Sequence, residues 1–115
     1  MKKYMLVFLS ESYADLNLSP EEIQNRMGKW FGWAEKMRAN NVYVGGEALT
    51  DTVKQISGPD RTVTDRSSTE LKELIGGYYT VEARDFEHAI DIAQDYPDYD
   101  LGGTVEVREI MVFDR

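Results

Sequence analysis

The sequence contains no cysteine and only one histidine, His88. Without cysteine, the chain cannot form a disulfide, attack through a thiolate or bind a metal through sulfur. A metal site built from several histidines of one chain is excluded as well, and we expect no cofactor. His88 lies off the apolar stripe of a predicted helix, so we expect it to be solvated rather than catalytic.

Basic residues and long apolar runs are also scarce. The chain has 13 Lys and Arg against 21 Asp and Glu, a net charge of -8. Nucleic-acid-binding proteins need a positive surface to attract phosphates, so we expect no nucleic-acid partner. The apolar run that follows Lys2 and Lys3 ends at Ser10, which is too short for a signal-peptide core or a membrane span. We therefore expect a cytoplasmic protein with no membrane partner.

The remaining composition is that of a folded protein. The chain has 115 residues, of which 42% are hydrophobic and 30% are charged. These values are ordinary for a globular domain of this length, which can bury a sizeable core. Only three prolines interrupt the chain and no repeat recurs. The sequence predicts a single domain spanning residues 1–115.

A first amphipathic helix is predicted from Ser19 to about Asn40. Ser19 can cap the helix, and Pro20 suits its first position. Apolar residues at helical spacing then form one face: Ile23, Met27, Trp30, Ala34 and Met37. Trp33 lies beside this face. We expect Trp30 and Trp33 to pack in the core or at an interface. The alternative is that they line an aromatic pocket between helix and sheet.

A second, shorter helix is predicted to begin after Asp85 and to end before Pro97. Its expected apolar face consists of Phe86, Ala89, Ile90 and Ala93. The acidic turn that follows lacks the spacing of a calcium loop. We expect its carboxylates to be solvated: Asp95, Asp98 and Asp100.

Strand-like runs occupy the rest of the chain. The sheet strands are predicted at Tyr4–Leu9, Val42–Glu47, Tyr78–Ala83 and Thr104–Phe113. A small hairpin is predicted at Thr52–Ile56 and Thr62–Thr64. The glycine pairs at 45–46, 76–77 and 102–103 are expected at turns or bulges. The order of elements predicts an α+β, ferredoxin-like split β-α-β fold with an inserted hairpin.

Alternation along the strands predicts how the sheet is covered. The strand at Tyr78–Ala83 has one apolar and one mixed side, whereas the strand at Tyr4–Leu9 is apolar on both sides. A strand that is buried on both sides needs a cover on each face of its sheet. The chain has no spare element for the second face. We therefore expect a homodimer in which two sheets pack face to face as a dimeric α+β barrel.

Glu106 and Arg108 share the mixed side of the last strand, two residues apart. An arginine on an inner wall can hold a carboxylate or phosphate through two hydrogen bonds. A glutamate beside it can act as a general base if burial raises its pKa. The alternative is that Arg108 pairs with Glu106, Glu82 or Glu109 and is purely structural.

Further candidates join this pair. Tyr78 and Tyr79 point to opposite faces of their strand, so one should be core and the other should face the barrel, where its hydroxyl could orient a ligand. The ionisable residues grouped with Glu106 and Arg108 are Glu47, Asp65, Lys72, Glu73 and Glu82. The simplest role for Asp65 is that of a turn residue.

Several segments together resemble the YCII-related family, and specifically its DGPF branch. They are Lys3–Phe8, Leu18–Glu22, Val44–Leu49, Lys72–Tyr79 and Gly102–Arg108. The resemblance covers nearly the whole chain and keeps the family's order of elements. It implies a ferredoxin-like fold assembled as a dimeric α+β barrel, in agreement with the alternation of the strands.

The sequence departs from the motif that gives the branch its name. Asp65, Lys72 and Glu73 align with the branch, but its Gly-Pro-Phe stretch is replaced by Arg66-Ser67-Ser68. Some members of the wider family carry a His and Asp pair suggested as catalytic. The first predicted helix has no histidine, so this pair does not carry over.

Two interpretations of function follow. In the first, the dimeric barrel binds a small, anionic molecule in a cleft between sheet and helices, as related barrels that are cofactor-free enzymes do. Asp65 and Glu106 would be the catalytic residues, and the ligand-binding residues would be Arg108, Tyr78, Glu47 and Lys72. In the second, the chain is a non-catalytic dimeric module for protein interaction or regulation. The sequence does not decide whether the chain is an enzyme.

Overall fold

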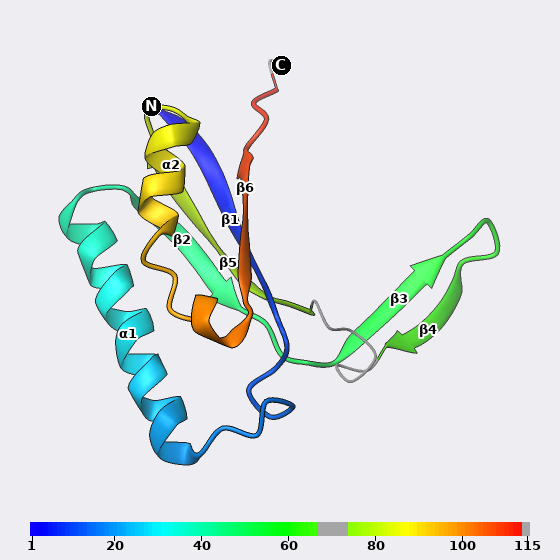
Figure 1. Ribbon diagram of the computed structural model, residues 1–115. Coiled ribbons are helices and arrows are strands. Elements are labelled where there is room, and N and C mark those ends of the chain that lie inside the picture. The colour runs from blue at the N-terminus through cyan, green and yellow to red at the C-terminus, as the bar shows by residue number, and fades with distance from the viewer. Residues whose placement is uncertain (67–73, 114–115) are drawn as a thin grey trace.

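The computed structural model describes residues 1–66 and 74–113 (Figure 1). Its elements are β1 (Lys2–Ser10), α1 (Pro20–Ala39), β2 (Tyr43–Ala48), β3 (Val53–Ser57), β4 (Thr62–Arg66), β5 (Leu74–Ala83), α2 (Phe86–Ala93), the 3-10 helix η1 (Tyr99–Leu101) and β6 (Thr104–Glu109). The predicted order of strands and helices is confirmed. The short η1 is an addition that the sequence did not indicate.

The main sheet has the strand order β2-β5-β1-β6, and neighbouring strands are antiparallel. Together with the two crossover helices, this order agrees with the predicted ferredoxin-like fold. Figure 1 shows α1 and α2 on one side of the sheet. We call the other side the open face. The strands β3 and β4 form a separate hairpin that leaves the sheet after β2.

The N-terminus of α1 is capped as predicted, because the Ser19 hydroxyl accepts a hydrogen bond of 3.1 Å from the backbone N–H of Glu22. The buried face is rotated from the predicted one. Met27 is 40% exposed, whereas Arg26 and Trp33 are buried. The large indole of Trp33 gains more from burial than the side chain of Met27, and this turns the helix.

The core lies between the helices and the sheet. Its buried members are Tyr4, Leu6, Phe8, Trp33, Met37, Val42, Val81, Ala83, Ala89, Ala93 and Tyr96, with Trp30 and Tyr79 packed against them. The ring centroid of Phe8 is 5.0 Å from that of Trp30 and 5.3 Å from that of Tyr96. Core packing of the two tryptophans is confirmed. These rings fill the space in which a cleft between sheet and helices was expected.

The three glycine pairs lie at irregularities of the backbone, as predicted. The β2–β5 ladder shifts register between Tyr43 and Gly45, and the β1–β5 ladder shifts where Gly76 is inserted. Gly102 ends η1 with a left-handed φ of +84°. Such a conformation favours glycine because it has no Cβ.

Two predicted strand boundaries were wrong. β5 begins at Leu74 rather than at Tyr78, because its ladder with β1 continues to the pair of Ser10 and Leu74. The last strand ends at Glu109 rather than Phe113, because β1 offers no further partner once Ile110 has donated to the Lys3 carbonyl. Met111, Val112 and Phe113 are therefore at least 72% exposed. In α2, which ends at Ala93, the small Ala89 and Ala93 are buried and Phe86 and Ile90 are nearly half exposed. The sheet approaches the helix most closely along its alanines.

Candidate functional site

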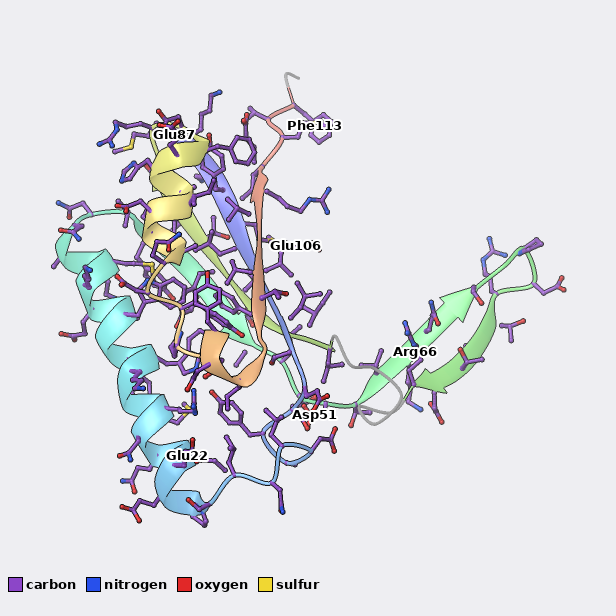
Figure 2. All side chains as sticks on the ribbon, viewed as in Figure 1. Glu22, Asp51, Arg66, Glu87, Glu106 and Phe113 are labelled. Atoms are coloured by element: carbon purple, nitrogen blue, oxygen red, sulfur yellow. The ribbon has the colours of Figure 1, made fainter. Side chains whose placement is uncertain are left out.

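One row of residues crosses all four strands of the sheet on the open face. Glu47 on β2 pairs with Tyr78 on β5. Tyr78 pairs with Val7 on β1, and Val7 pairs with Glu106 on β6. Directly paired residues share a face of the sheet. We call Glu47, Tyr78, Val7 and Glu106 the polar row. Figure 2 shows Glu106 on the side of β6 that faces away from both helices.

Glu47 and Tyr78 interact directly within this row. The Tyr78 hydroxyl donates to Oε1 of Glu47 over 3.3 Å. The negative charge of Glu47, assisted by desolvation and this hydrogen bond, raises the pKa of Tyr78 above its ordinary value of 10.0. The phenol therefore keeps its proton, which it donates to Glu47.

Arg108 lies one row further along β6. It pairs with Met5, which pairs in turn with Thr80. Two residues of strand place Arg108 about 7 Å along β6 from Glu106 on the same side of the sheet. In the described part of the chain, no carboxylate comes within ion-pairing distance of Arg108, and Glu109 pairs with Lys2 instead at 3.7 Å.

The floor between these polar groups is apolar. Met5, Val7 and Leu9 point to the open face from β1 and are half-buried within the single chain. Their opposite neighbours Tyr4, Leu6 and Phe8 are fully in the core. The predicted two-sided apolar character of β1 is confirmed. The open face therefore offers a carboxylate and phenol at one edge, a carboxylate and guanidinium at the other, and an apolar strip between them.

Of the six predicted site residues, Asp65 lies elsewhere and Lys72 lies outside the described residues. Asp65 is on β4 in the hairpin, where its carboxylate pairs with Lys54 at 2.9 Å and is 79% exposed. Within one chain it is not part of the polar row. Glu47, Tyr78, Glu106 and Arg108 are the predicted candidates that the structure places on one face.

A second polar cluster lies under the N-terminal half of α1. The guanidinium of Arg26 contacts Asp98 at 3.0 Å, Asp100 at 2.8 Å and Glu22 at 3.3 Å. Arg26 and Asp98 are buried, so the expectation that the whole acidic turn is solvated was wrong for Asp98. The nearby guanidinium compensates the cost of burying this carboxylate. The hydrogen bond from Arg26 lowers the pKa of Asp100 below its ordinary value.

This cluster continues into the first loop. Tyr13 donates to Asp98 Oδ2 at 2.7 Å and accepts from the indole N–H of Trp30 at 3.1 Å. Burial and the neighbouring Asp98 raise the pKa of Tyr13. Asp98 is thus held by two donors from different elements. The arrangement joins the loop after β1, helix α1 and the turn before β6.

The sequence held a signal for this cluster that the apolar stripe concealed. Arg26, Trp30, Trp33 and Met37 have helical spacings of four, three and four, which describe the face that is actually buried. A long basic residue on such a face requires an acidic partner. The acidic turn at 95–100 provides the nearest concentration of carboxylates in the folded chain.

His88 takes a structural position. Its Nδ1 accepts a hydrogen bond from the backbone N–H of Arg84 at 3.1 Å. The backbone N–H of His88 donates to the carboxylate of Asp85, which caps α2. It is partly buried rather than fully solvated, in a depression of about 290 Å³ between α1 and α2. Within residues 1–66 and 74–113, no three His, Asp or Glu side chains are grouped as a metal site requires.

Comparison with family models gives one match. The family model of the YCII-related domain matches residues 5–114. The chain belongs to the YCII-related family. The match extends from β1 beyond β6 and includes every residue of the polar row and Arg108. No curated protein matches this YCII-related chain. In its described part, neither helix is long and apolar enough to cross a membrane.

Proposed function

We propose that this YCII-related domain acts in the cytoplasm as a homodimer that binds a small, anionic molecule on the open face. In this assembly the open faces of two chains pack together as a dimeric α+β barrel. The half-buried apolar strip of Met5, Val7 and Leu9 supports this assembly, because an apolar sheet face gains by being covered. The polar row and Arg108 would then line the interior.

The observation that carries the proposal is the placement of Arg108 beside the polar row without an ion-pair partner in the described residues. A guanidinium can bind a carboxylate or phosphate through two parallel hydrogen bonds. Tyr78, whose hydroxyl proton is donated to Glu47, would orient the bound molecule by accepting a hydrogen bond at its phenol oxygen. Packing of a second sheet would exclude water and strengthen each of these contacts.

Whether the site also catalyses depends on Glu106. A carboxylate becomes an effective base when burial raises its pKa toward neutrality. In the single chain both Glu47 and Glu106 are exposed, and this observation favours the second candidate, a non-catalytic dimeric module for protein interaction or regulation. We also propose that the chain belongs to the DGPF branch of the family. The replacement of the branch's Gly-Pro-Phe by Arg66-Ser67-Ser68 favours the non-catalytic candidate as well.

Native mass spectrometry of the freshly purified protein tests the proposal. We expect a dimer that carries a discrete additional mass. Arg108→Ala should lose that mass and remain dimeric, whereas the matched control Arg84→Ala, an exposed arginine after β5, should keep it. A monomer would refute the assembly. A dimer whose Arg108→Ala variant keeps the ligand would refute the site, and a dimer without any ligand would favour the non-catalytic module.

A further inference from the structure

The β3–β4 hairpin is unusually independent of the rest of the chain. Figure 1 shows it projecting from the sheet on the side opposite the helices, which is the side of the open face. Its strands pair with each other and form no extensive contact with another described element. The radius of gyration is 15.9 Å, against about 13 Å for a compact domain of this length. We call Val53–Arg66 the arm.

A two-stranded hairpin is at best marginally stable when nothing packs against it. The faces of the arm show where a cover is needed. Ile56 pairs with Val63 and Lys54 pairs with Asp65, so these four side chains share one face. Ile56 is 66% and Val63 is 58% exposed. The opposite face contains Gln55 paired with Thr64 and is polar near its tip. An apolar pair beside an ion pair is typical of a surface that docks.

We propose that in the homodimer each arm extends to the partner and contributes its Lys54 and Asp65 to the end of the partner's polar row. This inference rests on the dimer proposed above. It assigns Asp65 to the site of the other chain, although the residue is remote from the site of its own chain. It also gives the exposed pair Ile56 and Val63 a surface to cover.

Charge favours a second copy as the occupant. The arm contains three basic and two acidic residues, a net charge of +1, in a chain whose total is -8. On the open face, Glu47, Glu82 and Glu106 outnumber the two basic residues Lys3 and Arg108. A mildly positive arm therefore meets a negative surface when it crosses to an identical chain. Two-fold symmetry would make the same contact twice.

The dimensions also permit the crossing. A strand of five residues spans about 17 Å, and packed sheets lie about 10 Å apart. Residues 49–52 join Ala48 to the arm and can span about 13 Å more, so Lys54 and Asp65, the second pair from the base, can also reach a facing sheet. The chain leaves the sheet directly after Ala48, which pairs with Gly77 beside the pair Glu47 and Tyr78. The base of the arm accordingly lies at the end of the open face where the polar row is located.

Because the chain contains no cysteine, a single cysteine can carry a probe at one chosen position. Ile56→Cys, labelled with a benzophenone maleimide, probes the apolar face of the arm. Gln55→Cys on the opposite face is the matched control. Each labelled protein is mixed with isotopically heavy wild-type protein, allowed to exchange subunits and irradiated. Mass spectrometry then separates links between chains from links within a chain.

We expect Ile56→Cys to give heavy–light links to peptides of β1, β5 or β6, and Gln55→Cys to give several-fold fewer. Links only within a chain, or links to α1 or α2 of the partner, would overturn the inference. Sedimentation of the wild-type protein is measured alongside. A monomer would refute the proposed dimer itself, whereas a dimer with only intrachain links would refute only the arm exchange.

A second measurement does not depend on labelling. Ile56→Asp should weaken self-association roughly tenfold, because it places a charge in the docked face. Gln55→Asp places the same charge on the opposite face and should leave the dimer dissociation constant nearly unchanged. Equal dissociation constants for the two variants would contradict the inference. Since both positions are exposed in the chain, neither substitution disturbs the core.

Discussion

Arg26 and Asp98 are 72 positions apart in the sequence, and their side chains form an ion pair of 3.0 Å with only 6% and 5% of their surfaces exposed. The pair links α1 to the turn that precedes η1, and η1 is followed directly by β6. Since β6 carries Glu106 and Arg108, this buried contact helps to fix the strand on which half of the candidate site depends.

Removing one partner of this pair should be costly. Asp98→Asn would remove the buried carboxylate beside Arg26 and leave the guanidinium only the more exposed Asp100 and Glu22. We expect the free energy of unfolding to fall by about 1.5–3 kcal/mol, the contribution of a hydrogen bond to a charged group. Asp100→Asn is the control, because the Asp100 side chain is 63% exposed and its loss should cost less than the loss of Asp98. Urea denaturation of the three proteins measures both values. Similar losses for the two variants would show that burial does not set the strength of the pair.

The buried tyrosines should make the fold sensitive to alkali. Burial raises the pKa of Tyr96 to about 12, from 10.0 for an unperturbed tyrosine. Between these values the unfolded chain releases a proton that the folded chain retains. The contribution of Tyr96 to the free energy of unfolding is therefore fully present below pH 10 and is lost as the pH rises toward 12. Tyr96→Phe should flatten this fall, as measured by urea denaturation at a series of pH values. An unchanged slope would exclude Tyr96 as a source of the alkaline loss.

The fold was largely predictable because local signals agreed with the final structure. Ser19 and Pro20 marked the start of α1, alternation divided Tyr78 from Tyr79, and the glycine pairs marked bulges. Each of these signals depends on a few neighbouring residues. Most of the open-face site was also predictable, because Tyr78, Glu106 and Arg108 alternate onto the mixed sides of their strands.

What failed required information from distant parts of the chain. The local sequence of a helix does not reveal that Arg26 will contact Asp98, so helical spacing alone favours the stripe through Met27. The last strand was extended to Phe113 because its alternation continues, although pairing with β1 ends near Lys3. The separation of Asp65 from the polar row depends on the direction in which the hairpin leaves the sheet. None of these tertiary relationships is encoded in local spacing.

The first glycine pair, Gly45 and Gly46, provides a paired test of backbone approach next to the site. A Cβ at Gly46 would collide with the Tyr78 carbonyl oxygen and the Tyr79 ring, whereas a Cβ at Gly45 would meet open space. Gly46→Ala should therefore destabilise the fold by about 1–3 kcal/mol through overpacking, and Gly45→Ala should have little effect. Thermal unfolding of both variants measures the difference. Equal melting temperatures would indicate that β2 moves away from β5 without cost.

The hydrogen bond between Glu47 and Tyr78 makes a prediction that can be read at a single atom. Because the negative charge of Glu47 is the largest contribution to the raised pKa of Tyr78, Glu47→Gln should bring that pKa down toward 10.0. The Cζ carbon of ¹³C-labelled tyrosine, assigned with Tyr78→Phe, reports the titration by NMR. Glu106→Gln is the control, since Val7 separates Glu106 from Tyr78 in the row and the pKa should change little. If the pKa of Tyr78 stays raised in Glu47→Gln, burial rather than charge holds the phenol protonated, and the role of Glu47 in orienting it falls.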